Sequence, residues 1–455
     1  MRLMHESNDH PPIQQIFAQI QDQKDAVFLD SSLPNQLGRF SIIGLAPYLK
    51  LVQGENFTVN GEIIDTDLTT WVKDYLRTHQ ETNDTTLPLI SGAIGYFSYD
   101  YGRKKEQVQT RHPKELDIPD CILVFYDNFI IEDHQEHRLY LIANDHGQTA
   151  DSGMEQMKKL LEKAKQQPFI PTAVSSGQAS ATANFTKQDY MDAVQRMISY
   201  IIEGDIYIAN MTQQLQIKSP VQPFEMFWRL RTDNPSPFGG YLNYGDFQVI
   251  SASPERFLEM RKGEIQTRPI KGTRKRGSTP EEDAALKLEL QQSGKDKSEL
   301  LMIVDLERND LNRICVPGSV KVTELFSVET YATVFHLISN VIGTLRPGLT
   351  VMDLLDATFP GGSITGAPKL RAMELIDELE HSRRNLYTGS IGYLSLDGCC
   401  DFNIVIRTAL HQNGLYHLGV GGGITYESEL GFEYEETLQK ALALLNALDC
   451  PGLQA

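Results

Sequence analysis

A single lysine, Lys271, lies between two backbone constraints in the segment QTRPIKGTRKRG, residues 266–277. Pro269 disfavours helix at the residue before it, so the backbone leading into the lysine is expected to be extended. Gly272 allows the chain to turn, or to approach a ligand, without a Cβ in the way. An amine is a nucleophile only when it is neutral, and burial or a nearby cation lowers its pKa toward that state. The segment indicates a candidate nucleophile, and the alternative is a solvated basic turn at the end of a strand.

Two carboxylates near this segment could act in acid catalysis or metal binding. Glu255 lies in SPERF, where it is either a surface-turn carboxylate or, if buried, an acid that can protonate a leaving hydroxyl. Glu299 falls at spacings of four and seven from Ile303 and Leu306, which places it on the apolar face of a predicted helix. A glutamate on such a face is costly unless it is paired or bound to a metal ion. Glu299 is therefore expected to have a partner of one of these kinds.

Three further features could hold an anionic substrate. Arg407 lies in the apolar strand segment IVIRT, and a guanidinium there is expected to meet a carboxylate through two parallel hydrogen bonds. The glycine-rich turns FPGGSITGAPK, residues 359–369, and GVGGGI, residues 419–424, offer free backbone N–H groups to an anion. By contrast, His336 lies in the apolar segment VFHLIS, where a histidine is more often a satisfied core residue than a functional one.

The composition is that of a globular cytoplasmic protein without a nucleic-acid or membrane partner. The net charge of −18 over 455 residues argues against a nucleic-acid surface, although a local basic cluster at residues 274–276 can still attract an anionic substrate. Five cysteines without C-x-x-C spacing are typical of reduced thiols and not of a disulfide framework or a zinc site. Residues 1–20 contain charges and two prolines, unlike a signal peptide, and no apolar run approaches the roughly 20 residues that cross a bilayer.

The chain is predicted to divide into a first region of residues 1–168, a linker of residues 169–184 and a second region of residues 185–455. The linker is expected because residues 166–183 are rich in Pro, Ser, Ala and Gly and have no hydrophobic pattern. Short alternating segments predict strands at Ala26–Leu29, Phe40–Leu45, Cys121–Phe125 and Leu139–Ile142. Helices are predicted over Phe185–Glu203, from Thr279 to about Asn312, over Leu370–Glu380, and from Tyr434 onward.

Taken in order, these segments resemble one known family across more than half of the chain. The motifs GDIYIANMTQ, SPERF, QTRPIKGT, DKSELLMIVDLERND, VFHLIS, GSITGAPK and YEET follow one another from Gly204 onward to the YEET that contains Glu436. They are similar to the signature motifs of the chorismate-utilising enzymes, which include anthranilate, aminodeoxychorismate, isochorismate and salicylate synthases. The resemblance implies an α+β fold in which two large, roughly orthogonal antiparallel β-sheets are flanked by helices, with the two sequence regions intermixed.

The resemblance also implies a role for each candidate residue. Lys271 would attack C2 of chorismate while Glu255 protonates the departing C4 hydroxyl, and His336 would lie near this leaving group. Glu299 and Glu436 would hold Mg²⁺ beside the ring carboxylate. The residues expected to bind the substrate are Ser363, Thr365, Gly366, Tyr387, Arg407, Gly421, Gly422 and Gly423.

Position 271 distinguishes the branches of the family. It is alanine in typical anthranilate synthases and lysine in aminodeoxychorismate synthase component I. With Lys271, the resemblance implies a transaminase-type amination of chorismate to 4-amino-4-deoxychorismate, on the way to p-aminobenzoate and folate. Two alternatives stay open. One is anthranilate synthase component I, and the other is a non-catalytic binder of chorismate or tryptophan that regulates a partner.

One departure from the family's pattern and one absence refine this expectation. Ile208 stands where relatives usually carry glutamine or lysine, and because isoleucine cannot take a proton, addition of water at C2 is not expected. The chain shows no cysteine in the context of an amidotransferase nucleophile. A separate glutamine amidotransferase subunit is therefore expected to supply the ammonia.

A possible regulatory pocket is indicated in the first region. Some relatives hold a tryptophan-like ligand beside an LLES segment, and residues 28–31 read FLDS, a partial match. The segment GAIGYFSYDYGR, residues 92–103, resembles a second motif of the same region. Asp30 and Ser31 are therefore interpreted either as part of a ligand pocket or as part of the core.

Overall fold

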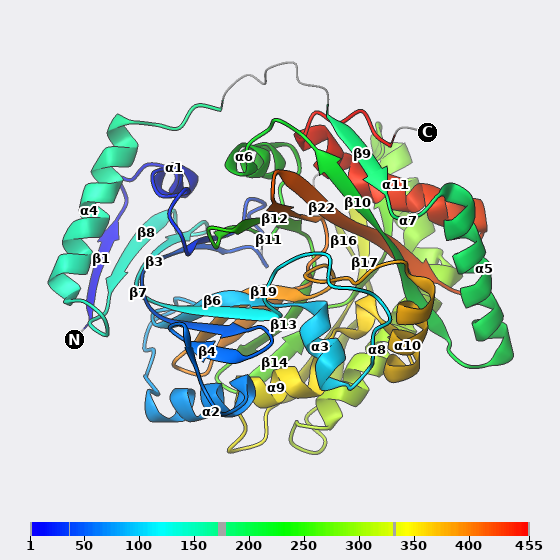
Figure 1. Cartoon of the computed structure of the whole chain (residues 1–455), viewed down its shortest axis with the longest axis horizontal. Helices are drawn as coiled ribbons and strands as arrows, with labels where there is room; N and C mark the ends of the chain where they lie inside the picture. Colours follow the sequence, from blue (N-terminus) through cyan, green and yellow to red (C-terminus); the bar gives the residue numbers. More distant parts are fainter. Residues whose placement is uncertain (1, 36, 172–178, 331–333, 454–455) are drawn as a thin grey trace.

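Two long strands, β3 (Phe40–Gln53) and β7 (Cys121–Asp133), belong to two antiparallel sheets at once (Figure 1). The structure is a computed structural model that describes residues 2–35, 37–171, 179–330 and 334–453. The first part of β3 pairs with the last part of β7, and a register shift between Pro47 and Leu49 separates this pairing from that of their other parts. Because such irregularities bend a strand and increase its twist, each strand passes from the first sheet into the second.

The first sheet runs from the N-terminal strand at one edge to a short strand before the first helix of the second region. All of its ladders are antiparallel. The two-residue strand β18 (Gly366–Ala367) pairs with the start of β10. The spatial order is β9 (Ser180–Ala183), β10 (Ile208–Lys218), β22 (Leu415–Ile424), β21 (Thr408–Gln412), β12 (Phe247–Ser253), β11 (Phe238–Asn243), β2 (Ala26–Asp30), β3, β7, β8 (Arg138–Ala143) and β1 (Leu3–Ser7).

The second sheet extends from the other ends of β3 and β7. Its ladders are also antiparallel. The order is β5 (Glu62–Ile63), β4 (Phe57–Val59), β3, β7, β6 (Gly92–Phe97), β19 (Ser390–Ser395), β20 (Cys400–Asn403), β13 (Arg256–Arg261), β14 (Glu264–Thr267) and β17 (Val334–Thr344). At the end of the sheet, β17 pairs on one side with β16 (Lys321–Thr330) and on the other with β14 and then β15 (Ile270–Lys275).

Side-chain caps set several helix boundaries. The Thr186 hydroxyl accepts a hydrogen bond from the N–H of Asp189 at the start of α5, and Gly204, with φ of 88°, ends this helix. The last helix begins at Leu430, one turn before the predicted start at Tyr434. The helices are α1 (Ile13–Ala18), α2 (Leu68–Thr78), α3 (Tyr99–Lys105), α4 (Ala150–Gln166), α5 (Lys187–Glu203), α6 (Pro223–Asp233), α7 (Pro280–Gln292), α8 (Gly294–Asn312), α9 (Val351–Thr358), the 3-10 turn η1 (Gly362–Ile364), α10 (Lys369–Leu379) and α11 (Leu430–Ala447).

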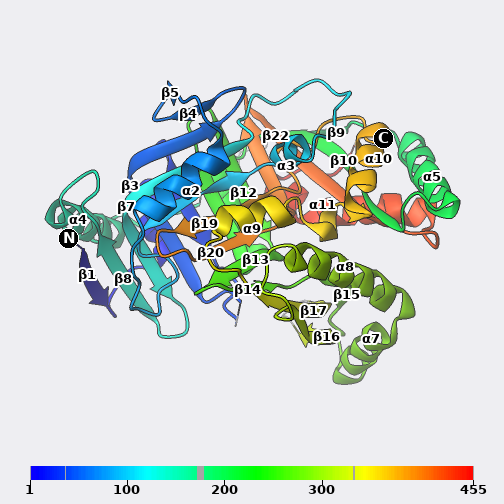
Figure 2. The same ribbon diagram turned by 90° about the horizontal axis from the view of Figure 1, so that it is seen from below.

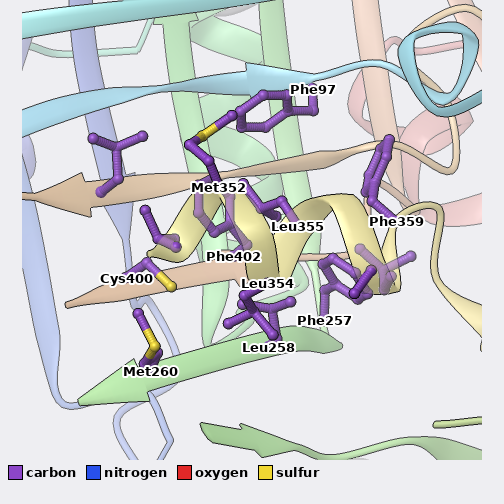
Figure 3. Packing of buried hydrophobic residues seen from close by; sticks show 14 of the residues in the cluster. Phe97, Phe257, Leu258, Met260, Met352, Leu354, Leu355, Phe359, Cys400 and Phe402 are labelled. Carbon is purple, nitrogen blue, oxygen red and sulfur yellow. The ribbon is translucent and has the colours of Figure 1, made fainter. Parts of the chain in front are cut away.

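The two sheets face each other, and helices cover their outer faces (Figures 1 and 2). Apolar side chains of β2, β3, β7, β12 and β19 fill the space between the sheets. Helices α1, α4, α6 and α11 pack on the first sheet, and α2, α3, α8 and α9 pack on the second. Figure 3 shows Met352 and Leu355 of α9 lying close to Phe97 of β6 and Phe402 of β20. The predicted α+β class with antiparallel sheets flanked by helices is confirmed.

The two sequence regions contribute strands to the same sheets. β2 pairs with β11 along its whole length, and β6 pairs with β19. The predicted linker, residues 169–184, contains residues 172–178, which lie outside the described residues. No helix in the part of the chain that the structure describes is both long and apolar enough to cross a membrane.

Candidate active site

Lys271 lies on β15 at a break in the ladder with β17. The register shifts between Lys271 and Thr273, and Gly272 between them has a φ of 73°. A Cβ at Gly272 would stand 2.7 Å from the carboxyl carbon of Asp296 on α8. Glycine is therefore required both for the left-handed backbone and for the close approach of the helix. The predicted turn is a bulge within a strand, and it holds the lysine strand against α8.

Ser363 connects the lysine with the candidate acid. The Lys271 Nζ donates a hydrogen bond to the carbonyl oxygen of Ser363 at 3.0 Å. The hydroxyl of Ser363 and the backbone N–H of Ile270 both donate to the carboxylate of Glu255. Glu255 is itself buried in the turn between β12 and β13. A candidate nucleophile and a candidate acid thus share one serine.

Burial raises the pKa of Glu255 above the usual carboxyl range. The nearby Lys271 ammonium and the hydrogen bond from Ser363 act in the opposite direction, but the effect of burial is larger. On α8, the pKa of Glu307 is also raised, well above its usual range, first by burial and then by Glu255. The site thereby favours the protonated carboxyl, the form that can donate a proton to a leaving group.

A buried ion pair that sequence reasoning missed holds the loop around Ser363. Arg384 pairs with Glu380 at 2.6 Å, just beyond α10. The same guanidinium donates to the carbonyl oxygens of Ile364 at 2.8 Å and Asn210 at 2.6 Å, which fastens η1 to β10. The i,i+4 spacing of glutamate and arginine was the available signal, but the same spacing is common on exposed helices.

Thr365 and Gly366, both expected to bind substrate, are engaged within this loop. The Thr365 hydroxyl donates to the carbonyl oxygen of Gly361 at 2.9 Å, and the Thr365 carbonyl accepts the N–H of Asn210 at 2.8 Å. A Cβ at Gly366 would stand 2.2 Å from the carbonyl oxygen of Ile208. Their observed contacts shape the loop against β10, and a contact with substrate stays a prediction.

Arg407 lies between β20 and β21 and not in a strand as predicted, because its left-handed φ of 51° is incompatible with a strand. A non-glycine residue adopts this conformation at a cost of about 1–3 kcal/mol. Within the described ranges its guanidinium makes no hydrogen bond or ion pair. Tyr387 and Glu436 are close enough to interact with it electrostatically. Burial lowers the pKa of Arg407. The ring of Tyr387 packs on Gly419, where a Cβ would lie 2.1 Å from a ring atom. A buried guanidinium without a partner fits a substrate carboxylate.

His336 lies on β17 directly opposite Thr273 of the lysine strand. Its Nδ1 is 2.9 Å from the Thr273 hydroxyl. Burial, and then the charge of Arg407, lower the pKa of His336 to about 4, so the imidazole is neutral at physiological pH. The structure therefore places this histidine beside the lysine strand and close enough to Arg407 for their charges to interact.

Carboxylates of α8 and α11 interact across the site. The pKa of Glu299 on α8 is raised first by burial, while Lys271 lowers it and Glu436 on α11 adds to the rise. Glu433, which sequence reasoning missed, is buried one turn before Glu436, and its pKa is raised first by burial and also by this neighbour. The E-x-x-E spacing in GFEYEET was the signal for it. Like charges held together in this way are typical of groups that share a cation.

The donor set of these helices fits a magnesium ion that keeps several waters. Oxygens of Glu436 and Glu433 lie 2.6 and 3.3 Å from the point where a Cβ of Gly422 would stand, so both carboxylates meet at one place on β22. In the described ranges, no three His, Cys, Asp or Glu side chains are grouped closely enough to hold a metal ion by themselves. Carboxylate oxygens are the ligands that Mg²⁺ prefers, whereas a closed cage of protein ligands is not formed here.

The glycines of β22 bring its backbone close to charged groups. The carbonyl oxygen of Gly421 accepts a hydrogen bond from Lys440 Nζ at 2.8 Å, and this amine lies 3.4 Å from Glu436. A Cβ on Gly423 would stand 4.0 Å from the Nζ of Lys271. Lys440, four residues after Glu436, is a further functional candidate that sequence reasoning missed, and burial lowers its pKa.

The structure separates the predicted site residues into two groups. Asp30 and Ser31 line a cavity of about 460 Å³ that reaches Arg256 and Arg268. Asp30 pairs with Arg231 at 3.0 Å, and the Ser31 hydroxyl donates to backbone carbonyl oxygens, so both side chains have partners within the protein. The other group consists of Lys271 and the predicted site residues on the elements around it, which are Glu255, Glu299, His336, Ser363, Thr365, Gly366, Tyr387, Arg407, Gly421, Gly422, Gly423 and Glu436.

A lysine beside a buried acid, an unpaired guanidinium and facing carboxylates fit an enzyme site for a small anionic substrate. Residues 25–446 match the family described as chorismate binding enzyme, and the chain belongs to this family. The match confirms the resemblance found in the sequence motifs.

Named relatives come from two branches of that family. The chain is 37% identical over 450 residues to aminodeoxychorismate synthase component 1 of Bacillus subtilis, covering 96% of this chain and 94% of that protein. It is 36% identical over 453 residues to anthranilate synthase component 1 of Pseudomonas aeruginosa, covering 95% and 92%. The crystal structure of anthranilate synthase component I from Streptococcus pneumoniae superposes with a TM-score of 0.81 at 31% identity, covering 90% of this chain and 93% of that one.

Proposed function

We propose that this chain aminates chorismate with ammonia to give 4-amino-4-deoxychorismate, the reaction of an aminodeoxychorismate synthase component 1 in p-aminobenzoate and folate biosynthesis. The observation that carries the proposal is the sharing of Ser363 by Lys271 and Glu255. An amine and an acid held by one residue suit an addition in which a nucleophile enters as a hydroxyl leaves.

In the first half of the reaction, neutral Lys271 attacks C2 of chorismate. The two ring double bonds shift, the bond between C4 and its hydroxyl breaks, and Glu255 gives its proton to the departing oxygen, which leaves as water. The raised pKa of Glu255 supports this role because a carboxyl that keeps its proton is available as an acid. The product of this half is a secondary ammonium group that joins the enzyme to the ring and keeps both protons of the lysine nitrogen.

In the second half, ammonia attacks C4 and the double bonds shift back. The bond between C2 and the Lys271 nitrogen breaks, and one proton from the attacking ammonia goes to the Glu255 carboxylate that the first half left behind. The released lysine amine and the protonated glutamate are ready for another turnover. The two halves together exchange a hydroxyl for an amino group without any change of oxidation state.

The charged and polar groups around Lys271 and Glu255 are proposed to orient the substrate. Arg407, with Tyr387 and the backbone of residues 421–423, is proposed to hold the enolpyruvyl carboxylate. Glu299 and Glu436 are proposed to hold Mg²⁺, with water molecules as its other ligands, beside the ring carboxylate, where the ion would supply a hard positive charge that neutralises this carboxylate. Neutral His336 is proposed to lie near the C4 leaving group.

The proposal includes a partner and a place for a regulatory ligand. The ammonia is proposed to come from a separate glutamine amidotransferase subunit, in keeping with the words "component 1" in the names of the relatives. The cavity lined by Asp30 and Ser31 is proposed to take a small ligand of the tryptophan type. Asp30 and Ser31 are already engaged in an ion pair and a hydrogen bond within the protein. Such a ligand would therefore be recognised through other groups of the cavity.

Anthranilate synthase activity is the second candidate, because relatives of that name are nearly as similar. The two reactions differ in the atom of chorismate that receives nitrogen and in the loss of pyruvate. The deciding experiment incubates the purified chain with chorismate, Mg²⁺ and excess ammonium, and identifies the product by mass and by its retention against standards. A product that keeps the enolpyruvyl group and carries nitrogen at C4 supports the proposal, and anthranilate with pyruvate contradicts it.

A further inference from the structure

Asn210 on β10 is held firmly by its backbone, whereas its side chain has no partner. Its N–H donates to the carbonyl oxygen of Thr365 at 2.8 Å, and its own carbonyl oxygen accepts from the guanidinium of Arg384 at 2.6 Å. The side-chain amide makes no hydrogen bond with any residue that the structure describes, although only 9% of the residue is exposed. Because a buried amide without partners is unfavourable, it indicates a partner from outside the chain.

The next two polar side chains of β10 both have partners. The Thr212 hydroxyl donates to the carboxylate of Glu380 at 2.7 Å, and the Gln213 amide donates to the hydroxyl of Thr437 at 2.5 Å. These contacts join β10 to the end of α10 and to α11. The unpartnered amide of Asn210 is therefore particular to this position on the strand.

The ladder between β10 and β22 directs the Asn210 side chain toward the lysine. Asn210 lies directly opposite Gly423, and opposed residues of an antiparallel pair extend from the same face with Cβ atoms about 4.5–5.5 Å apart. On that face, a Cβ of Gly423 would stand 4.0 Å from the Nζ of Lys271 and 3.5 Å from the Cδ1 of Ile208. Ile208, two positions before Asn210, extends from the same face, as the period of a strand requires. The amide of Asn210 and the amine of Lys271 therefore border one space beside Gly423.

The proposed lysine adduct needs a second hydrogen-bond acceptor in this space. In the first half of the reaction the Lys271 nitrogen becomes a secondary ammonium group with two N–H bonds. The carbonyl oxygen of Ser363, already 3.0 Å from Nζ, accounts for one of them. A charged donor that is left unpaired in a buried site costs more than a neutral one, so the other N–H bond also requires an acceptor.

We propose that the side-chain oxygen of Asn210 accepts the second N–H bond of the Lys271 nitrogen in the adduct. This inference rests on the proposed function. Asn210 thereby touches the reacting nitrogen and stabilises the adduct relative to free lysine and chorismate. Its backbone contacts with Thr365 and Arg384 fix the place from which the oxygen reaches the amine, so the acceptor is in position before the adduct forms.

The amount of adduct provides the test. The purified chain is incubated with chorismate and Mg²⁺ without ammonia, and the ratio of modified to free protein is determined by intact-mass spectrometry. Asn210→Leu and Asn210→Asp form a matched pair, because both have nearly the shape of asparagine and only aspartate keeps an oxygen that accepts hydrogen bonds. Gln216→Leu, at an exposed position of the same strand, controls for the loss of an amide. Thermal unfolding checks the fold, and Asn210→Ala is the second variant in case leucine prevents folding.

The adduct ratio is expected to fall by about 10–100-fold in Asn210→Leu and Asn210→Ala, the factor for a lost hydrogen bond to a charged group. It should equal that of the wild type in Gln216→Leu and be at least as high in Asn210→Asp. A wild-type ratio in the leucine and alanine variants would overturn the inference. An equal fall in the leucine and aspartate variants would also overturn it, because it would assign the role to the amide N–H groups. No adduct on a wild type that still aminates chorismate would overturn it as well. A wild type that forms no C4-aminated product when ammonium is added would instead overturn the proposed function, and the failures are thereby distinguished.

Discussion

The cluster around His146 and the active site use opposite arrangements of charge. His146 Nδ1 lies 2.9 Å from Asp127, and its Nε2 lies 3.1 Å from Glu81. These bonds raise the pKa of His146 to about 9. Burial acts to raise the pKa values of Asp127 and Glu81, but their hydrogen bonds together outweigh it, so that the pKa of Asp127 is lowered and that of Glu81 falls to about 2. Every member of this cluster is held in its charged form by a partner.

In the active site, burial acts without enough compensating partners. It raises the pKa values of Glu255, Glu299 and Glu307 and lowers those of Arg407 and Lys440, so each group is shifted toward its neutral form. The difference teaches that paired charges, as in the His146 cluster, contribute stability, whereas buried and poorly paired groups reduce it and are a feature typical of functional sites.

Removal of the Lys271 amine is expected to have the largest effect. Incubation of the wild type with chorismate and no ammonia should add the mass of the dehydrated substrate to the protein, and peptide sequencing should place it on Lys271. Lys271→Ala should form no adduct and lose C4 amination by on the order of a thousandfold or more, because the covalent route is closed. Direct attack of ammonia on C2 could then give 2-amino products, which the same mass analysis detects.

Lys271→Arg is the matched control for this prediction. Arginine keeps the positive charge but stays protonated and supplies no neutral amine, so the adduct should be absent here too. An adduct on any other residue, or no added mass on the wild type, would show that the lysine acts only as a charge.

Loss of the Glu255 carboxyl is expected to have the second-largest effect on activity. Glu255→Gln should lower kcat for amination by about 10²–10⁴-fold, the usual range for removal of a general acid. Because burial raises its pKa, the wild-type acid keeps its proton to higher pH than an ordinary carboxyl, and activity should fall on the alkaline side as that proton is lost. The pH profile of kcat should lose this alkaline limb in the glutamine variant, and an unchanged limb would assign it to another group.

The sequence was sufficient to single out Lys271 and Glu255, which the structure places near one another, but not the contacts that hold the surrounding segments. Lys271 and Glu255 stand out because proline, glycine and short motifs mark their surroundings locally. The Arg384–Glu380 pair and Lys440 act through carbonyl oxygens of distant segments, and no local pattern reports such contacts. Helix and strand positions were predictable from periodicity, whereas the passage of β3 and β7 between two sheets depends on long-range pairing and a register shift.

Neutral replacement of the facing carboxylates is expected to weaken the response to magnesium. Glu299→Gln and Glu436→Gln should each raise the Mg²⁺ concentration for half-maximal activity by about 10–100-fold, since each removes one charged oxygen ligand. Activity should be titrated against Mg²⁺, with thermal unfolding as a check on the fold. Asp305→Asn, on the exposed face of α8, is the control, and superimposable titrations for all four proteins would contradict the assignment.

His146→Gln is expected to reduce stability in a way that depends on pH. The folded pKa of about 9 lies above the usual value of about 6.5, so the protonated form is favoured by folding. The contribution, on the order of 1–2 kcal/mol after allowance for partial exposure, is complete below about pH 6.5 and is lost as the pH rises through 9. Urea midpoints at pH 6 and pH 10 should show a difference between wild type and variant that narrows at the higher pH. If the difference in urea midpoint between wild type and variant is the same at both pH values, His146 contributes to stability through its shape and not through its charge.

Glu307→Gln is expected to produce the smallest effect and one of opposite sign. In the described residues the only hydrogen bond of the Glu307 carboxyl is with the Thr267 hydroxyl at 3.1 Å, and the single proton of that hydroxyl is shared with the carbonyl oxygen of Phe257 at 2.7 Å. Lys369, whose charge acts to lower the pKa of Glu307, already pairs with Asp310 at 2.6 Å. The carboxylate form of Glu307 is therefore poorly compensated, which agrees with its strongly raised pKa.

Because the folded state binds the Glu307 proton more tightly than the unfolded state, the stability of the wild type falls as the pH rises above about 4.3, the unfolded value. Glutamine has nearly the same shape and no charge, so the variant should be more stable than the wild type by about 1 kcal/mol at pH 8 and equal to it near pH 4. Denaturant unfolding at both pH values measures this, with Asp305→Asn as the exposed control on the same helix. A variant that is less stable at pH 8 would show that Glu307 is charged and well paired, and the active site would then resemble the His146 cluster in this respect.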